Sequence, residues 1–429
     1  MLAGSHRNAW PDETGTGGRT NRNTHQLNGS KYDFNCTLRC QAVNSRDLNQ
    51  LFIIMAQKSL LDYLESIPDP RNQAKCSHIL SEVVFMAICA MMCGFDTWSE
   101  ITLFAQEREP WFRRWLRLPG GIPSHDTFNR IFATLPPASL KSIFQAWIGD
   151  IMGDEKLVGQ LAVDGKALRA TAKGQGANAV HMVNVWSTEL GMCVGQQKVA
   201  DKSNEITAIP ELLQLLELKG CLVSIDAMGT QVKIADTILK KSGDYLLAVK
   251  DNQPSLNTEV KEQFQAYWDK NETDVSGHGF TEQFDSEHGR KEHRRCWVLV
   301  VDESMPVCQQ WEAKTIIAVQ AERIENGKGY DFVRFYISSR ALDATSALKA
   351  TRAHWSVENL LHWTLDIAFG EDQLQARAGF AGENLAVIRQ WILNILKQNK
   401  SRNLSMANKR RLCCLNEQYL FECMGLFKV

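Results

Sequence analysis

Three acidic residues, Asp164, Asp226 and Glu358, have the residue types and the sequence surroundings of metal ligands. Each aspartate follows an apolar run typical of a buried strand, residues 161–163 before Asp164 and residues 221–225 before Asp226. If the two strands are neighbours, both carboxylates lie at one edge of one sheet, where their charges repel and a divalent cation relieves the repulsion. With Glu358 as the third ligand, two Mg²⁺ or Mn²⁺ ions about 4 Å apart would form a phosphoryl-transfer site.

Glu358 lies in a segment with the pattern of an amphipathic helix. At 3.6 residues per turn it shares one face with His354, Leu361, His362 and Leu365. The spacing of His354, Glu358 and His362 also suggests a zinc site. In an unbroken helix, however, the two histidines lie about 12 Å apart along the axis, too far to bind one ion through bonds of about 2.1 Å.

Other acids compete for the third position. Asp366 is the reserve candidate, and Glu205, Glu371 and Asp372 are further alternatives. Glu205 lies near an expected helix start, where a negative charge stabilises the helix dipole. Any one acid alone is explained more simply as a turn former or an ion-pair partner. The combination of three at matching places in one topology favours the metal site.

The elements expected to position these acids are those of a ribonuclease-H-like fold of the α/β class. Three strands, at 161–164, 180–186 and 192–199, precede a helix at 209–218, which starts near Asn204 or Thr207, and the strand 221–225. A helix at 231–241 and a strand at 245–250 complete the order β-β-β-α-β-α-β. Two further helices, at about 346–368 and 383–398, follow.

The chain is expected to divide into four regions. Residues 1–54 resemble a disordered leader, which Met55 could replace as the natural start, and 55–150 form a small all-α domain. Residues 151–400 form the catalytic domain with a β-rich insertion at about 251–340, and residues 401–429 form a basic C-terminal segment.

A helix-turn-helix is possible within the all-α domain. Ser124 has the position of an N-cap before a short helix at 125–132 with one polar face, which suits a DNA-reading helix. An ordinary capped helix packing through Phe128 and Ile131 explains the same pattern equally well.

Composition sets broad limits. The formal net charge is −1, so any DNA contact must come from local basic clusters. The longest apolar stretch, residues 79–95, contains Ser81 and Glu82 and is shorter than the roughly 20 apolar residues that a membrane span needs. The twelve cysteines lack a Cys-x-x-Cys pair, which favours reduced thiols and a bacterial cytoplasmic, nucleoid-associated protein.

Several long motifs resemble those of the H-repeat-associated proteins, a group of DDE-type insertion-sequence transposases. The similarity extends from about residue 59 to about residue 400. The motifs are Ala162-Val163-Asp164-Gly165-Lys166-Ala167-Leu168-Arg169, Lys202-Ser203-Asn204-Glu205, Asp226-Ala227-Met228-Gly229, Gly243-Asp244-Tyr245-Leu246-Leu247-Ala248-Val249-Lys250 and His354-Trp355-Ser356-Val357-Glu358-Asn359. The resemblance implies that Asp164, Asp226 and Glu358 are the catalytic and metal-binding triad.

The sequence departs from the pattern Tyr-x2-Arg-x3-Glu-x6-Lys that related transposases carry on the last catalytic helix. Thr351, His354 and Leu365 occupy the places of the Tyr, Arg and Lys. The usual clamp on the transposon-end phosphate is therefore missing. The substitutes expected to bind DNA are Lys166, Arg169, Lys250, Arg352 and His354, and solvated surface cations are the alternative explanation of these residues. A separate basic stretch could neutralise DNA phosphates, and a solvated helix end explains it equally well: Lys397, Lys400, Arg402, Lys409, Arg410 and Arg411.

The implied function is a DNA transposase. Such an enzyme cleaves the ends of its element and joins the 3′-hydroxyl to target DNA by two-metal phosphoryl transfer, as a homodimer that pairs two double-stranded ends. A domesticated or inactive DNA-binding protein and a plain metal-dependent nuclease of the same fold are the alternatives.

Overall fold

The computed structural model describes residues 58–425, except 154–155, 173–178, 201–203, 271–278, 288–289, 326–327 and 374. The chain divides into two units, residues 1–56 and 57–429, and the description below concerns the second. The predictions for residues 1–54 and for Met55 lie outside the described residues.

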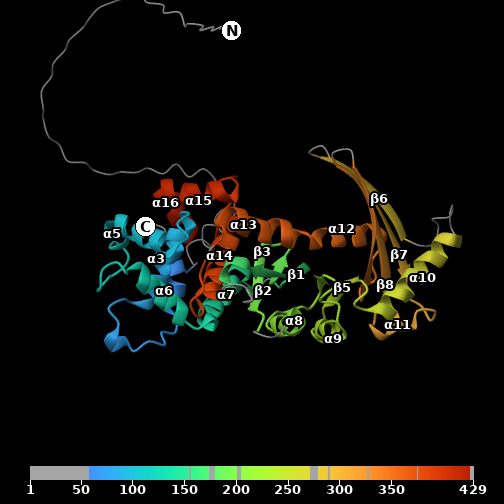
Figure 1. The fold of residues 1–429 in the computed structure, drawn as a ribbon, viewed down its shortest axis with the longest axis horizontal. Helices are drawn as coiled ribbons and strands as arrows, with labels where there is room; N and C mark the ends of the chain where they lie inside the picture. Colours follow the sequence, from blue (N-terminus) through green and yellow to red (C-terminus); the bar gives the residue numbers. More distant parts are fainter. Residues whose placement is uncertain are drawn as a thin grey trace, which may run out of the picture. The chain divides into compact units, whose positions relative to one another are not determined.

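One nine-stranded mixed sheet runs through this unit, in the order β3-β2-β1-β4-β5-β9-β8-β7-β6 (Figure 1). The strands are β1 (Gly159–Leu168), β2 (Val180–Ser187), β3 (Met192–Lys198), β4 (Cys221–Ile225), β5 (Asp244–Val249), β6 (Gly279–Glu287), β7 (Arg290–Val300), β8 (Thr315–Glu325) and β9 (Lys328–Ser338). The unit is thus a mixed α/β fold built on one large sheet.

The first five strands follow the order that the sequence predicts. β1 pairs antiparallel with β2 and parallel with β4, and β4 pairs parallel with β5. The intervening helices are α8 (Glu205–Gln214), whose N-cap Asn204 is one of the two predicted starts, and α9 (Val232–Lys240), which begins one residue after the predicted start. β1 is longer than expected: it continues past Asp164 to Leu168 along β2.

The insertion extends the same sheet and does not form a separate module. β9 pairs antiparallel with β5, and β8, β7 and β6 follow outward as an antiparallel series. The expectation of β-structure is therefore confirmed. The insertion also contains a 17-residue helix, α10 (Pro254–Lys270), and the short α11 (Pro306–Gln310), which the sequence analysis did not include.

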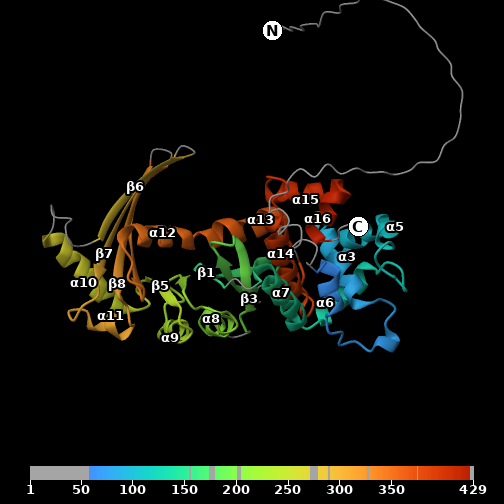
Figure 2. The same cartoon turned by 180° about the vertical axis from the view of Figure 1, so that it is seen from behind.

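The two faces of the sheet carry different helices (Figures 1 and 2). Leu161, Val163 and Val223 belong to the core that also contains the buried residues of α8, α9 and α10. Leu222 and Leu246, whose side chains alternate to the other face, pack with α12 (Ala344–His354). This second face is the one on which the acidic residues lie.

The helices at the two ends of this unit share one core. From the N-terminal part come α2 (Leu60–Glu65), η1 (Gln73–Lys75), α3 (Leu80–Met92), α4 (Trp98–Glu107), α5 (Glu109–Phe112), α6 (His125–Thr134) and α7 (Pro137–Met152). They pack with α14 (Ala381–Gln398), α15 (Met406–Leu415) and α16 (Glu417–Met424). We call this group the helical body.

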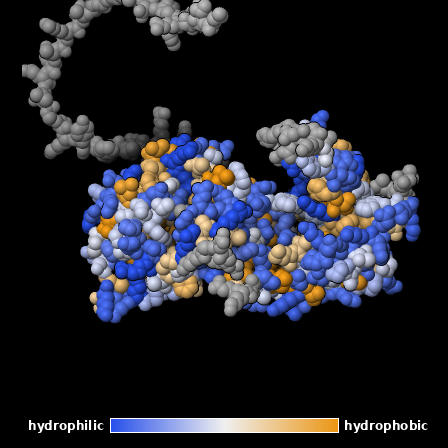
Figure 3. Space-filling model, in the orientation of Figure 1, coloured by the Kyte–Doolittle hydropathy of each residue, from blue (hydrophilic) through white to orange (hydrophobic). Residues whose placement is uncertain are grey.

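The apolar stretch at 79–95 forms α3, in which all thirteen residues are buried in the helical body. No helix in the described part of the chain has the length and apolar character needed to cross a membrane. The face of the molecule in Figure 3 is mainly hydrophilic, with small scattered groups of apolar residues.

Candidate active site

Asp164 and Asp226 leave neighbouring parallel strands at the same level. The pairing between β1 and β4 ends at Val163 and Ile225, and each aspartate is the next residue of its chain segment. Both line a cavity of about 340 Å³, and Glu358 lines it as well. The three acids singled out from the sequence are therefore brought together at one edge.

The turn that carries Asp226 is tightly fixed. The Gly229 backbone N–H donates to Asp226 Oδ1 (3.2 Å), and Thr230 Oγ1 donates to the Ala248 carbonyl oxygen at the end of β5 (2.6 Å). A Cβ at Gly229 would lie 2.3 Å from Ile225 Cγ2, so a larger residue there would displace the strand end. Glycine is required for this close approach.

Glu358 comes from an irregular part of the helical segment that covers the sheet. Between α12 and α13 (Trp363–Phe369), the π-helical turn η3 (Val357–His362) has the Trp363 N–H donating to the Glu358 carbonyl, five residues earlier. π-Turns inside α-helices occur frequently at functional sites. Here the turn places Glu358 and His362 beside Asp164.

His362 joins the two carboxylates. Its Nδ1 lies 2.9 Å from Glu358 Oε2 and 3.5 Å from Asp164 Oδ2, and its side chain is almost fully buried. Ligand atoms of these three residues all lie within 4.8 Å of one another, a spacing that could hold a metal ion. From the sequence, His362 was expected on the Glu358 face, and only a zinc site shared with His354 was considered for it and excluded.

A buried chain of polar groups orients His362 from behind. Its Nε2 lies 3.1 Å from Asn184 Nδ2, Asn184 Oδ1 accepts from Gln390 Nε2, and Gln390 Oε1 lies 3.1 Å from Cys193 Sγ. With these amide orientations Asn184 donates to Nε2, so the imidazole proton is on Nδ1 and points at Glu358. Asn184 and Gln390 were missed from the sequence.

Electrostatics separate the two carboxylates. Burial raises the pKa of Asp164 to about 6; His362 opposes this rise, and the nearby charge of Asp226 adds to it. The pKa of Glu358 is lowered, chiefly by the hydrogen bond from His362. The ionised form of Asp164 is thus only partly compensated, and a cation would complete the compensation.

Lys166 is not on the surface where DNA could reach it. Its side chain is 8% exposed, and its ammonium group contacts the His362 carbonyl oxygen (3.2 Å), Asp366 Oδ1 and Glu371 Oε2 (3.6 Å). The prediction that Lys166 binds a phosphate is corrected by this burial. Asp366, the reserve for the third acid, is paired with Lys166 and does not line the cavity.

The remaining predicted DNA-binding cations have different surroundings. Lys250 is exposed and lines the cavity of the three acids. Arg169 is highly exposed, with Nε 3.4 Å from Asp372 Oδ2. Arg352 is 41% exposed and its Nη1 lies 3.0 Å from Asp285 Oδ2, beside a second pocket.

His354 is half-buried at the cavity wall. Its Nδ1 lies 3.1 Å from Ser224 Oγ, and burial lowers its pKa, so the ring is neutral at pH 7. It is not a member of the cluster formed by Asp164, Glu358 and His362. The spacing that suggested zinc therefore does not bring His354 and His362 to one ion, even though the helix is interrupted by a π-turn.

Two lysines of the basic stretch near the C-terminus, Lys409 and Lys397, contact other parts of the fold. The buried Lys409 ammonium donates to the carbonyl oxygens of Leu396 and Asn399, 2.7 Å each, at the C-terminal end of α14. Such a cation satisfies carbonyls that the helix leaves unpaired and compensates the helix dipole. Lys397 Nζ lies 4.4 Å from the Trp186 ring centroid, and burial lowers its pKa to about 8.

Arg410 has a comparable position inside the helical body. Its guanidinium donates to the Met91 and Ala368 carbonyl oxygens, the final turns of α3 and α13, and pairs with Asp96 (2.6 Å). Lys409 and Arg410 therefore do not form the predicted DNA surface, because their charges are buried. The remaining exposed members of the stretch are Lys400, Arg402 and Arg411.

The proposed recognition helix is present as α6. Ser124 is its N-cap, accepting from the Thr127 N–H, and Phe128 and Ile131 are buried as expected. Its exposed side chains include His125, Asp126 and Arg130. DNA contact by this helix stays a prediction.

Comparison with known proteins identifies the family. Residues 159–395 match the family described as Transposase DDE domain, and residues 61–148 match the family described as DDE_Tnp_1-associated. "Putative transposase YncI" of Escherichia coli O157:H7 is 39% identical over 86% of this chain and 95% of its own length. "H repeat-associated putative transposase YhhI" of E. coli K12 is 37% identical over 85% and 97%. The solved synaptic complex of piggyBac transposase with hairpin DNA matches 88% of this chain and 80% of that chain, at 9% identity and a TM-score of 0.40. The family match covers more than half of the sequence and contains all three acids of the cavity, and the chain therefore belongs to the Transposase DDE domain family.

Proposed function

We propose that this chain is an active DNA transposase. It would hydrolyse a phosphodiester at each end of its element and then join the exposed 3′-hydroxyl to target DNA. The observation that carries the proposal is the convergence of Asp164, Asp226 and Glu358 on one cavity at the edge of the sheet. On this view β1–β5 with their helices form a ribonuclease-H-like catalytic core, preceded by a helical domain at the N-terminal side.

The donor set fits hard divalent cations. Carboxylate oxygens are the ligands that Mg²⁺ and Mn²⁺ prefer, and the raised pKa of Asp164 reflects an acidic site that a cation would stabilise. Asp164, Asp226 and Glu358 would hold two ions, which when bound would activate the attacking oxygen and neutralise charge on the phosphate. Which metal serves, and how many ions, belong to the proposal.

The chain's own residues would hold and orient the DNA. Lys250, exposed at the cavity, would contact a phosphate near the scissile bond, and Arg169 and Arg352 would contact the backbone further away. The neutral His354 would contact the DNA through the ring nitrogen that does not face Ser224. Lys166 is left out of this group because it is buried.

The partners follow from the reaction. Two element ends must be brought together, so we propose a homodimer that pairs two double-stranded ends in a synaptic complex. The site of action would be nucleoid DNA in a bacterial cytoplasm.

The test is strand cleavage and joining by the purified full chain with Mg²⁺ or Mn²⁺. The substrate is a DNA duplex taken from the ends of the chain's own gene. Asp164→Asn, Asp226→Asn and Glu358→Gln should each lower the rate by about 1,000-fold or more. Glu211→Gln, an exposed acid on α8 across the sheet, is the control and should cleave like the parent.

The possible results separate the alternatives. Cleavage without joining would indicate a plain nuclease, and binding without cleavage a domesticated DNA-binding protein. Full activity of Asp164→Asn or Glu358→Gln would refute the assignment of the site.

A further inference from the structure

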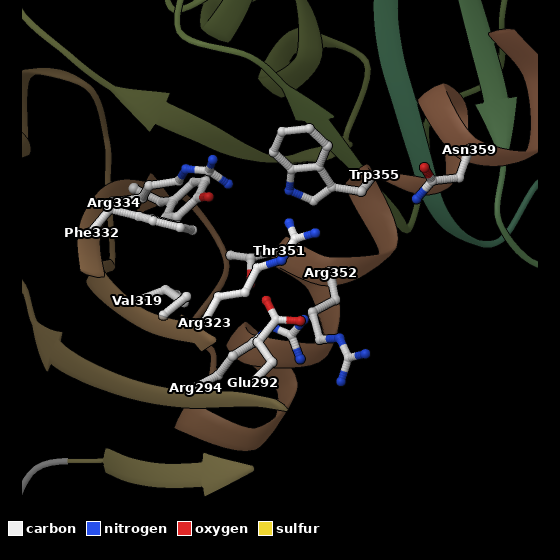
Figure 4. Close-up of a pocket in the computed structure, with 12 residues that line it drawn as sticks. Glu292, Arg294, Val319, Arg323, Phe332, Arg334, Thr351, Arg352, Trp355 and Asn359 are labelled. Atoms are coloured by element: carbon white, nitrogen blue, oxygen red, sulfur yellow. The ribbon is translucent and has the colours of Figure 1, made fainter. Parts of the chain in front are cut away.

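A second pocket, of about 400 Å³, lies on the same face of the sheet as the acids (Figure 4). Strands β7, β8 and β9 of the insertion form its floor, and α12 with the following turn forms one wall. Its side chains point from these elements toward a common space. The residues that matter below are Glu292, Arg294, Arg323, Arg334, Arg352 and Trp355.

The lining is strongly basic, with four arginines and one glutamate. Arg294 is only 15% exposed and pairs with Asp285 and Glu292, while Arg352 is more open and also pairs with Asp285. Asp285 and Glu292 thus neutralise Arg294 and Arg352 in part. A pocket lined by several arginines favours an anionic ligand.

Arg334 is held by aromatic side chains and not by a carboxylate of the described residues. Its guanidinium carbon lies 4.6 Å from the Phe332 ring centroid and 4.8 Å from that of Trp355. No ion pair with a carboxylate is formed by Arg334 in the described part of the chain. The two rings and the Tyr336 hydroxyl, which hydrogen-bonds to Arg334, position a guanidinium whose charge no described carboxylate neutralises, and this is the preorganised state of an anion-binding arginine.

The pocket continues into the cavity of the three acids. Arg334, Tyr336 and Trp355 line both spaces, so an extended ligand could occupy both at once. A polymer with a repeating anionic group suits this arrangement better than a small anion, because one of its groups can reach the acids while the next reach the arginines.

We propose that this pocket binds the phosphodiester backbone of a DNA strand next to the bond that is cut, with Arg334 and Arg352 contacting phosphates. This inference rests on the proposed function and deepens it. The phosphate contacts would then come from Arg334 on the insertion strand β9 and from Arg352 on α12, in place of the usual residues that Thr351, His354 and Leu365 replace. The Trp355 ring holds the Arg334 guanidinium beside the catalytic cavity.

The experiment measures equilibrium binding of a fluorescein-labelled gene-end duplex to the full chain by anisotropy, in Ca²⁺ and over a series of salt concentrations. Arg334→Ala and Arg352→Ala should each weaken binding by about tenfold and lower the log–log salt slope by about 1. Arg334→Lys, which keeps the charge and loses the planar fork, should keep the slope and weaken binding less. The control, Lys261→Ala on α10 across the sheet, removes one exposed charge and should change neither quantity by a comparable amount.

A second arm locates the contact and excludes small anions. Single neutral methylphosphonate linkages are placed along the strand beside the scissile phosphate. At one position the methylphosphonate should weaken binding of the duplex to the parent protein but should not weaken its binding to Arg334→Ala any further. This is the result expected for a direct arginine–phosphate pair. Inorganic pyrophosphate should not compete at a concentration matched to the duplex phosphates.

The outcomes are decisive in either direction. The inference would be overturned if both alanine variants kept the affinity and the salt slope of the parent. It would also be overturned if Lys261→Ala lost as much affinity as they do, or if Arg334 were needed to bind pyrophosphate while the duplex did not bind. Failure of the proposed function is a different result, namely no metal-dependent cleavage by the parent. Thermal melting of both alanine variants shows whether they are folded, and Arg352→Ala, altered at an exposed position, provides the test if Arg334→Ala does not fold.

Discussion

Buried charges have opposite surroundings in the helical body and in the catalytic cavity. In the helical body Arg410 pairs with Asp96, Arg389 pairs with Glu371, and Lys409 meets two carbonyl oxygens. In the cavity, no described lysine or arginine forms an ion pair with Asp164, Asp226 or Glu358. Lys166, the nearest in sequence, is directed instead to Asp366 and Glu371.

The difference separates groups that stabilise the fold from groups kept for a ligand. A buried charge with all its partners holds elements together, and removing it leaves those partners unpaired. A cavity that collects like charges destabilises the free protein until a counter-ion or substrate binds. Removing a charged group should therefore destabilise the free protein in the helical body and stabilise it in the catalytic cavity.

The largest expected effect is in the helical body. Arg410→Met should lower the free energy of unfolding by about 3–5 kcal/mol, because Asp96 and two helix-end carbonyls lose their buried donor. Denaturant titration in the absence of DNA measures this loss. The neighbouring Arg411→Met, at an exposed position, should stay within about 0.5 kcal/mol of the parent. Equal effects of the two changes would contradict the contrast between buried and exposed cations.

A smaller effect is expected from the polar chain behind His362. Asn184→Ala removes the donor to Nε2, so the Nδ1 proton is no longer held toward Glu358, and affinity for Mn²⁺ should fall about 10- to 100-fold. Calorimetric titration with Mn²⁺ measures this directly. Asn257→Ala, which removes another buried asparagine that donates to Asp251, is the matched control and should bind Mn²⁺ like the parent. Unchanged affinity in Asn184→Ala would show that the chain has only a packing role.

Removing the charge of Asp164 should stabilise the free protein, whereas removing the charge of Arg410 should destabilise it. Because the pKa of Asp164 is raised to about 6 in the folded chain, above its unfolded value, the parent binds more protons when folded and loses stability as pH rises from about 4 to 6. Asp164→Asn cannot ionise. In EDTA it should be more stable than the parent above pH 6, by on the order of 1–2 kcal/mol, and equal to it below pH 4.

Thermal melting across this pH range, with and without Mg²⁺, checks the prediction. Added Mg²⁺ should stabilise the parent and leave Asp164→Asn nearly unchanged, because a ligand stabilises only the state that binds it. If the variant were less stable than the parent at pH 7 in EDTA, Asp164 would be a structural acid like Asp96.

The sequence was sufficient for the features that depend on local pattern. The apolar runs 161–163 and 221–225 correctly predicted two strands that deliver Asp164 and Asp226, because strand alternation is local and the β-β-β-α-β-α-β order leaves few topologies. The helix α10 could also have been recognised, since Leu256, Val260 and Phe264 recur at four-residue spacing and are all buried.

The features that were missed depend on contacts between distant residues. His362 and Asn184 are 178 positions apart, and Asn184 and Gln390 are 206 apart, so only the packing of η3 and of α14 against the sheet brings them together. For the same reason the basic run near the C-terminus was misinterpreted. Charge is visible in the sequence, whereas the burial of Lys409 and Arg410 under neighbouring helices is not.

The smallest expected effect concerns Lys250, the exposed lysine at the rim of the cavity. If it contacts one phosphate, Lys250→Ala should lower the log–log salt slope of DNA binding by about 1, while stability stays within about 0.5 kcal/mol of the parent. Lys314→Ala, an exposed lysine that lines neither pocket, is the control. Anisotropy at several salt concentrations measures the slope, and an unchanged slope would place Lys250 away from the DNA. Arg410→Met is expected to change stability, whereas Lys250→Ala should change the salt slope of DNA binding without changing stability. This pair of results would show that cations of the helical body stabilise the fold and that Lys250 binds DNA.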